Sequence, residues 1–200
     1  MTAPGQLTEP EVDPTPETEP ERRPILHVVA AWLVLIALVL GVLFVAATAR
    51  LFVWPPTDSP TKVDAIVALG GDPAQLRAKQ AVALAEAGYA REVVISLGGY
   101  PPDPCLKAKA GIHVTCFRAD PLSTRGEVEY IARLVRVKHW TSLLMVPEMD
   151  QATRARMLFR RCSSVHLVVV PVSAHGFNLF YDLAYEWASL AKAFVVHTSC

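Results

Sequence analysis

Two hydrophobic patterns divide this 200-residue chain. The first is a continuous apolar run at residues 25–49, which contains no Asp, Glu, Lys or Arg. A helix needs about 20 apolar residues to cross a bilayer, and each Leu, Ile, Val or Phe at its centre favours insertion by about 0.3–0.6 kcal/mol. We therefore predict a transmembrane signal anchor at 25–49.

In the rest of the chain, short apolar runs alternate with helix-periodic segments. The runs are rich in Val, Ile and Leu and are continuous, which is typical of strands buried on both faces. Strand–helix alternation of this kind predicts a parallel sheet with right-handed crossovers. The predicted fold class is α/β: a Rossmann-like, doubly wound, mainly parallel sheet preceded by one transmembrane helix. We expect strands at 63–70, 92–97, 112–117, 142–147 and 166–172, and helices at 73–87, 124–137, 150–161 and 178–195.

The last predicted helix combines an apolar face with two acidic residues. Asp182 and Glu186 lie four residues apart, and a like-charge pair at this spacing is mildly unfavourable on a free surface. Lys192, near the helix C-terminus, suits the helix dipole. We expect the apolar face to pack on the sheet through Phe180, Leu183, Ala184, Trp187, Leu190, Ala191 and Phe194.

Composition changes sharply along the chain, although the net charge of the whole is zero. Residues 1–24 hold six of the sixteen prolines, six acidic residues and two arginines, so we predict a disordered, acidic, proline-rich tail. Residues 50–61 form a short, stiff linker in which we expect Trp54 at the membrane interface. Residues 62–200 form one domain with 16 Lys and Arg against 12 Asp and Glu; this net charge of +4 is compatible with an anionic ligand or membrane surface.

Charges and cysteines together favour an extracytoplasmic C-terminal domain. Two arginines closely precede the apolar run and one follows it, which favours a cytoplasmic N-terminus. All four cysteines follow the run, as expected for an oxidising compartment. A cleavable signal peptide is the alternative, because Ala47-Thr48-Ala49 fits a cleavage pattern and Arg22-Arg23 resembles a twin-arginine signal. The run is longer than a signal-peptide core, so we favour a single-pass protein of the cell membrane.

The four cysteines are Cys105, Cys116, Cys162 and Cys200. Cys105 and Cys116 flank a short loop and make the most natural disulfide, but four cysteines allow three connectivities and the sequence does not choose among them. The alternative to disulfides is two buried thiols and two incidental ones.

Two glycine turns are candidate ligand sites, because ligands of open parallel sheets bind beyond the carboxyl ends of the strands. Glycines at strand ends would let the backbone approach a ligand closely, with free N–H groups at a helix start. The alternative is a tight strand–helix turn in which Asp72 is the N-cap. The candidate residues are Gly70, Gly71 and Asp72 after the first strand, and Ser96, Gly98 and Gly99 after the second.

Three arginines are predicted near helix starts on the same rim: Arg77, Arg125 and Arg154. A cation at that position is disfavoured by the helix dipole by about 0.3–1 kcal/mol. Together they suggest a pocket for a carboxylate or phosphate; singly, each is more often a solvated surface charge. Thr124 and Glu127, three residues apart, match a capping box.

The sequence offers no support for several common cofactors. It contains neither GxGxxG nor GxxxxGK[ST], no zinc-like spacing of His, Cys and Asp, and no GxSxG elbow. The cofactor therefore stays unknown, and we predict neither a metal site nor a nucleic-acid partner. His175 follows the last strand and is either a loop residue or a general base.

Residues 62–198 resemble the YdcF-like domain shared by SanA- and ElyC-type envelope proteins. The matching segments are DAIVALGGD, Arg77, AGYAREVVISLGG, LSTRGE and the arginine of TRARMLFRRC. The family's Tyr-His-x-x-Arg-Ala segment differs here, because residues 150–155 lack the Tyr and His and keep only the arginine. The resemblance implies a Rossmann-like domain, often behind one membrane helix, in bacterial cell-envelope biogenesis. It also implies a site made of the glycine turns, Arg77, Ser123, Thr124, Glu127 and Arg154.

Three functional hypotheses follow. The first is a membrane-anchored envelope protein that binds an anionic small molecule or a lipid-linked phosphate, with Glu186 included among its site residues; whether it is an enzyme stays open. The second is a non-catalytic envelope interaction module, because the missing Tyr-His pair leaves only His175, Asp150 or Glu186 as a general base. The third, cytoplasmic nucleotide or S-adenosylmethionine binding, requires the opposite topology. For the first hypothesis we expect Arg125→Ala and Arg154→Ala to abolish binding without unfolding the domain.

Overall fold

The computed structural model of the chain describes residues 23–71, 75–98, 104–173, 179–196 and 198–200. Residues 1–22 of the predicted tail lie outside the described residues. The chain divides into two compact units, Met1–Leu43 and Phe44–Cys200.

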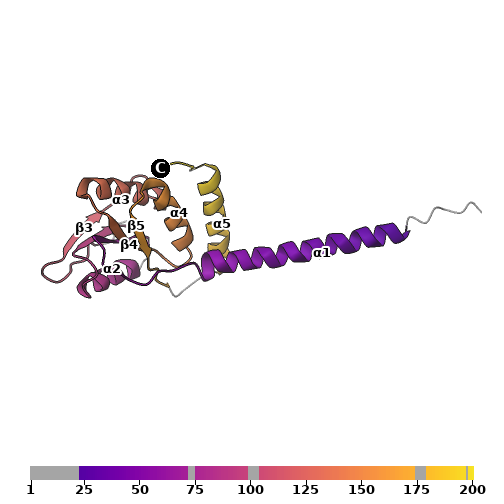
Figure 1. Cartoon of the computed structure of the whole chain (residues 1–200), viewed down its shortest axis with the longest axis horizontal. Coiled ribbons are helices and arrows are strands. Elements are labelled where there is room, and N and C mark those ends of the chain that lie inside the picture. The colour runs from indigo at the N-terminus through magenta and orange to yellow at the C-terminus, as the bar shows by residue number, and fades with distance from the viewer. Residues whose placement is uncertain (1–22, 72–74, 99–103, 174–178, 197) are drawn as a thin grey trace, which may run out of the picture. The chain divides into compact units, whose positions relative to one another are not determined.

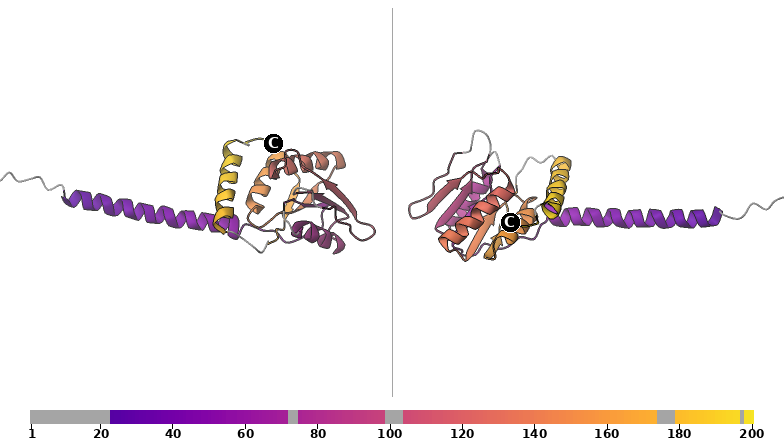
Figure 2. Two further views of the ribbon diagram at one scale, coloured as in Figure 1. Left: turned by 180° about the vertical axis from the view of Figure 1, so that it is seen from behind. Right: turned by 90° about the horizontal axis from the view of Figure 1, so that it is seen from above.

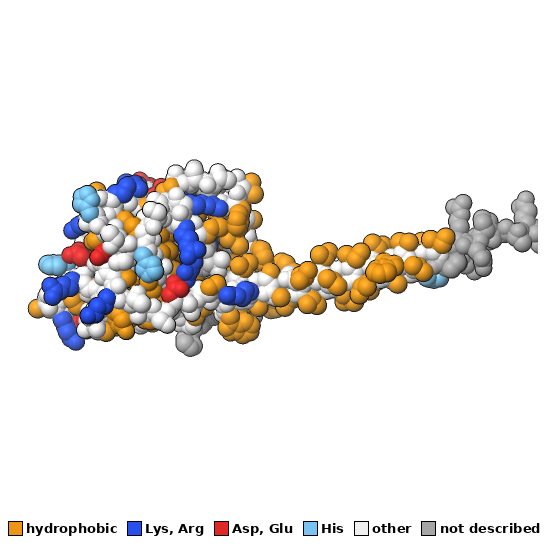
Figure 3. Space-filling view, viewed as in Figure 1, with side chains coloured by type: hydrophobic (Ala, Val, Ile, Leu, Met, Phe, Trp, Pro, Cys, Tyr) orange, Lys and Arg blue, Asp and Glu red, His pale blue; other side chains and the backbone are white. Residues whose placement is uncertain are grey.

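The N-terminal apolar run is helical, as predicted. Helix α1 (Arg23–Thr48) continues directly into a single π-helical segment, η1 (Ala49–Val53). Together, residues Ile25–Val53 form the one helix among the described residues that is long and apolar enough to cross a membrane. Figure 3 shows hydrophobic side chains along the visible length of α1.

The sheet confirms the predicted fold class. It has five strands, all parallel, in the order β3-β2-β1-β4-β5 (Figure 1). All four residues of β1 are buried, as the continuous apolar run predicted for a central strand. The strands are β1 (Ala65–Ala68), β2 (Glu92–Ser96), β3 (His113–Phe117), β4 (Ser142–Val146) and β5 (His166–Val169).

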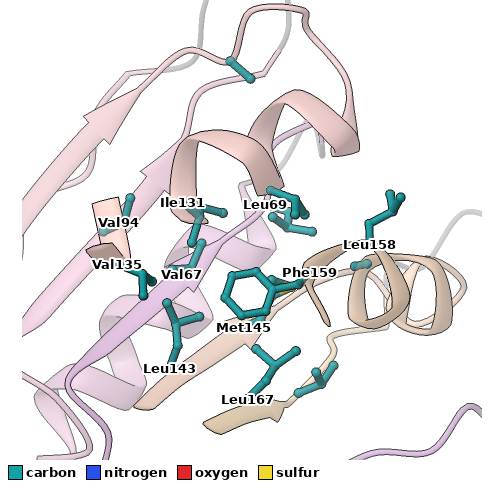
Figure 4. Close-up of a cluster of buried hydrophobic side chains, with 14 of the residues drawn as sticks. Val67, Leu69, Val94, Ile131, Val135, Leu143, Met145, Leu158, Phe159 and Leu167 are labelled. Carbon is teal, nitrogen blue, oxygen red and sulfur yellow. The ribbon is translucent and has the colours of Figure 1, made fainter. Parts of the chain in front are cut away.

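Helices cover both faces of the sheet, as the two views of Figure 2 show. Helix α2 (Leu76–Glu86) packs on one face. Helices α3 (Thr124–Lys138) and α4 (Ala152–Cys162) pack on the other, and α5 (Leu179–Val195) packs against α4. The two faces have separate cores. In the core beneath α3 and α4, the labelled side chains of Figure 4 are Val67, Leu69, Val94, Ile131, Val135, Leu143, Met145, Leu158, Phe159 and Leu167.

The prediction for the apolar face of α5 was wrong in part. Leu190 is buried, and Leu183 and Trp187 are half-buried, but Phe180, Ala184, Ala191 and Phe194 are exposed. The reason is that α5 packs mainly against α4 and not across the sheet, so only one side of the helix is covered. We call the uncovered side the exposed face of α5; it consists of Phe180, Tyr181, Ala184, Tyr185, Ala188, Ala191, Lys192, Phe194 and Val195.

The end of the apolar helix folds together with the α/β domain. The indole of Trp187 stacks on Phe44 and meets Phe52 edge-on, each at 5.3 Å between ring centroids. Its Nε1 donates to Oγ1 of Thr48 (3.1 Å), and the hydroxyl of Thr153 donates to the carbonyl of Leu51 (2.6 Å). These contacts join the last turns of the apolar helix to α4 and α5.

The predicted linker is held against the edge of the sheet. The backbone N–H of Asp58 donates to the carbonyl of Val169 (2.9 Å), and the Asp58 carboxylate accepts from the Val169 N–H (2.8 Å). Arg156 pairs with the same carboxylate at 2.9 Å. The linker thereby covers edge strand β5, which would otherwise present unpaired backbone groups.

The four cysteines form two disulfides, Cys105–Cys116 and Cys162–Cys200. The first is the pair that the sequence favoured. The second joins the end of α4 to the residues that follow α5.

Candidate functional site

The topology places the switch point of the sheet at the carboxyl end of β1. The chain runs from β1 through α2 to β2 on one side, and α3 then leads across to β4 on the other side of β1. Ligands of doubly wound sheets bind at such a switch point. We call the region around this switch point the crevice; Gly70 after β1, Glu148 to Gln151 after β4, and the first turns of α2, α3 and α4 meet there.

Glu127 of α3 reaches into this crevice and is buried. Its Oε1 accepts a hydrogen bond from the backbone N–H of Gly70 at 2.7 Å. Burial raises the pKa of Glu127, while the nearby Ser96 hydroxyl, the Gly70 N–H and the charges of Arg77 and Arg154 act in the opposite direction. The Ser96 hydroxyl is near enough to Glu127 to stabilise its charged form. The buried Ser96 Oγ nevertheless makes no hydrogen bond of normal geometry with any described residue.

Arg77 lies in the first turn of α2 and is almost fully buried. Its Nη1 donates to Oε1 of Gln151 (2.9 Å), and its Nη2 is 4.0 Å from the Glu148 carboxylate. The predicted position near a helix start is confirmed. The Arg77 guanidinium thereby joins α2 to the loop after β4. Because a cation is disfavoured at the positive, N-terminal end of a helix, the Gln151 and Glu148 oxygens stabilise it there.

Arg154 and Glu186 form a buried, two-pronged ion pair. Nε and Nη2 of Arg154 donate to the two carboxylate oxygens of Glu186 at 2.9 and 2.7 Å. The pairing with Arg154 also explains why the like-charge pair Asp182 and Glu186 is tolerated on one helix. Glu186 is buried and does not share a free surface with Asp182. The pairing changes the expectation for Arg154→Ala, which would leave the Glu186 carboxylate buried without its counter-ion.

Asp150 is a buried carboxyl group in the crevice whose pKa is shifted toward neutrality. It is buried, and its Oδ1 has no hydrogen-bond partner among the described residues. Burial raises the pKa of Asp150 to about 6, and the negative charges of Glu148 and Glu186 add to this; the Gln151 N–H and Arg154 oppose it. Such a carboxyl group can accept or release a proton near neutral pH. The sequence placed Asp150 among the possible bases, but its burial could not be read from local pattern.

The glycines after β1 and β2 allow the two turns to pack backbone against backbone. A Cβ on Gly98 would collide with the backbone nitrogen of Gly71 and lie 2.7 Å from its Cα. A Cβ on Gly70 would lie 2.8 Å from the Ser96 carbonyl oxygen, and Gly71 has a positive φ of 103°. The backbones of these glycines pack directly on one another, which is why side chains are excluded there. The expected N-cap at Asp72 was wrong, because α2 begins at Leu76 and its N-cap is Gln75.

The capping prediction for α3 was wrong by one residue. The N-cap is Ser123, whose Oγ accepts from the Gly126 N–H at 3.2 Å, and Thr124 is the first helical residue. Glu127 lies beyond the capping-box position and bonds Gly70 in the crevice. Arg125 pairs with Glu129 on the next turn at 2.6 Å.

A pocket of about 580 Å³ opens beside the crevice, between the start of α3 and α5. This is within the usual size range of small-molecule sites. Arg154 lines it as well as the crevice, so the two are adjacent. Three cations face it against the single carboxylate of Glu129. Its polar lining includes Ser123, Thr124, Arg125, Arg154, Tyr185, Ser189 and Lys192.

The predicted site residues therefore fall into three groups. The crevice brings together Gly70, Gly71, Arg77, Ser96, Gly98, Glu127, Arg154 and Glu186. The adjoining pocket takes Ser123, Thr124 and Arg125. Asp72 and Gly99, together with His175, lie outside the described residues. Within the described part of the chain, no group of His, Cys, Asp and Glu is arranged to hold a metal ion.

Comparison with known proteins identifies no relative. No protein-family model, no curated protein and no solved structure matches the chain.

Proposed function

We propose that this chain is a membrane-anchored protein of the bacterial cell envelope that binds an anionic small molecule or a lipid-linked phosphate. The observation that carries the proposal is the pocket between α3 and α5. Arg125 of α3, Arg154 of α4 and Lys192 of α5 come from three helices and all line it. The N-terminus of α3 adds its positive dipole end.

The proposed location rests on two features. The apolar helix at Ile25–Val53 is long enough for a single-pass anchor. The two disulfides favour an oxidising compartment for the domain that contains them. A tether at the bilayer would raise the effective concentration of a membrane-borne ligand at the pocket. The resemblance of several segments to the YdcF-like family supports the envelope setting, and Gly70, Arg77, Glu127 and Arg154 of these segments lie at the crevice.

Ligand binding can be tested with variants that spare the buried Arg154–Glu186 pair. The full chain in detergent would be titrated with inorganic phosphate, pyrophosphate and a short-chain lipid phosphate by calorimetry. Arg125→Gln and Lys192→Gln should each weaken binding about 10- to 150-fold, because a charge-assisted contact contributes about 1.5–3 kcal/mol. Lys138→Gln, at the far end of α3, is the matched control. Equal affinities in all three variants would exclude the pocket as the anion site.

The location has its own test. An alkaline phosphatase fused to the C-terminus, active only outside the cytoplasm, should be active in cells. Activity of a cytoplasm-specific reporter at the same position would contradict the proposal and favour the cytoplasmic nucleotide hypothesis.

A non-catalytic interaction module is the second candidate, and one observation favours it. Arg125 and Arg154 each already pair with a carboxylate of the chain itself, so both have a structural role without any ligand. In this case, crosslinking in cells should capture one envelope protein at the same yield from wild type, Arg125→Gln and Lys192→Gln. A yield that falls with either variant would favour the anion pocket.

A further inference from the structure

The exposed face of α5 is apolar for almost its whole length. Phe180 is 86% exposed, Tyr181 69% and Phe194 58%. The two acidic residues of this helix turn away from that face, because Glu186 is buried and Asp182 is half-buried. Lys192 is the one charged residue of the face, and Figure 3 shows hydrophobic side chains over α5. A continuous apolar face of this kind marks an interaction surface.

The middle of α5 is in contact with the end of the apolar span. Trp187 stacks on Phe44, packs edge-on against Phe52 and donates to Thr48, and all three belong to the span Ile25–Val53. These residues and α5 lie in the same compact unit. If the span is in a bilayer, the residues that contact its last turns must lie at the bilayer boundary.

We propose that the exposed face of α5 lies in the lipid–water interface as a second, monotopic membrane contact. The inference rests on the membrane anchoring proposed above but not on the ligand. An interfacial helix carries aromatic and apolar residues on its buried side and basic residues at its border. Phe and Tyr provide the first feature, and Lys192 provides the second with its long stem.

Neighbouring residues have the same character. Trp54 directly follows the span and is 72% exposed, and Trp is enriched at membrane interfaces. Arg50 donates from Nη1 to the carbonyl of Trp54 (2.9 Å), which places a cation at the same level. Near the C-terminal end of α5, Arg161 donates to the carbonyl of Ala193 and lies over the ring of Phe194. Arg50 and Trp54 thus lie at the end of the span and Arg161 lies beside α5, and these are the residue types that a surface for anionic lipid requires.

The bilayer is favoured over a second copy of the chain because Trp187, in the same helix as the face, contacts the last turns of the span. A protein partner would have to cover the face while avoiding the membrane beside the exposed ring of Phe44. Docking on lipid also affects the pocket, since Tyr185 and Lys192 line it and belong to the exposed face. The α5 wall of the pocket would then lie among lipid headgroups.

The test is nitroxide accessibility in the full chain, reconstituted in vesicles of phosphatidylethanolamine and phosphatidylglycerol. Labels would be placed by Ala184→Cys and Ala188→Cys on the exposed face. Arg136→Cys, exposed on α3, is the matched control, and Ala37→Cys in α1 reports on the anchor. The native cysteines do not compete for the label, since all four are in disulfides.

We expect labels at 184 and 188 to gain collisions with oxygen and to lose collisions with a water-soluble nickel chelate, relative to the label at 136. Nickel accessibility equal to that at 136, with the label at 37 in hydrocarbon, overturns the docking but leaves the anchor intact. Exclusion of both reagents with dipolar coupling between two copies also overturns it, because the face is then a dimer interface. Nickel access at 37 removes the anchor and this inference with it, while phosphate titration still tests the pocket separately.

Discussion

At the scale of single residues, Arg154 is the side chain whose observed role differs most from the role that its position in the sequence suggested. A cation in the first turn of a helix suggested an anion pocket. Its main partner is Glu186, 32 residues later, in a geometry with two short hydrogen bonds. Arg154 therefore joins α4 to α5 and lines the pocket at the same time.

Removal of one partner should destabilise the domain strongly. Arg154→Ala should lower the free energy of unfolding by about 3–5 kcal/mol, because it leaves a buried carboxylate uncompensated. The double variant Arg154→Met, Glu186→Leu should be at least as stable as wild type, since it removes both charges. Urea denaturation of the full chain in detergent, followed by circular dichroism, measures both. A wild-type midpoint for Arg154→Ala alone would contradict the buried pair.

Asp150 should make the stability of the domain depend on pH in an unusual direction. Because its pKa is raised from 3.8 to about 6, the folded state binds the extra proton between these values. The free energy of unfolding therefore falls as the pH rises through this window and stays lower above it. Asp150→Asn should flatten the profile and stabilise the domain at pH 8, by up to roughly 3 kcal/mol at about 1.4 kcal/mol per pKa unit.

Asp64 is the matched control, with the opposite sign. Hydrogen bonds from Thr141 and Ser142 lower the pKa of Asp64, so its contribution to stability is present at neutral pH and lost in acid. Asp64→Asn should destabilise the domain at pH 8. A stability loss at pH 8 in both variants would contradict the account of Asp150.

At the scale of elements, the turns after β1 and β2 act as one unit. Their backbones approach so closely that side chains are excluded at Gly70 and Gly98. Gly98→Ala should therefore destabilise the domain by about 1–3 kcal/mol, the usual cost of overpacking. Gly41→Ala, whose Cβ would have no neighbour within 4 Å, is the control and should leave the denaturation midpoint unchanged. Equal midpoints for both variants would show that the two turns do not touch.

At the scale of the whole molecule, the two disulfides restrain different lengths of chain. Cys162–Cys200 spans 38 residues and Cys105–Cys116 spans 11. In the chain-entropy model these loops correspond to stabilisation by about 4 and about 3 kcal/mol. Serine pairs at 162 and 200 should therefore lower the unfolding midpoint more than serine pairs at 105 and 116. The reverse order would indicate that the long loop is already ordered in the unfolded chain.

Local pattern was sufficient for most of the architecture. The continuous Val/Ile/Leu runs correspond to β1, β2, β4 and β5, and the apolar run at 25–49 lies within a helix. Strand β3 also forms where it was expected, but as an edge strand with alternating burial. These features depend on residues close in sequence, where periodicity reports burial directly. Positions near helix starts were also predictable, so Arg77, Glu127 and Arg154 could be assigned to one rim before their partners were known.

The partners themselves depend on segments far apart in the chain. The sequence by itself determined a long apolar helix, a parallel α/β domain, and a rim with glycines and arginines, because these follow from local composition and spacing. Only the tertiary structure decided that Arg154 meets Glu186, that Asp150 is buried with a raised pKa, and that α5 turns an apolar face outward. The burial and the charge pairing arise where α4 and α5 pack together. The hydrophobic periodicity within one helix does not specify which face of another helix packs against it.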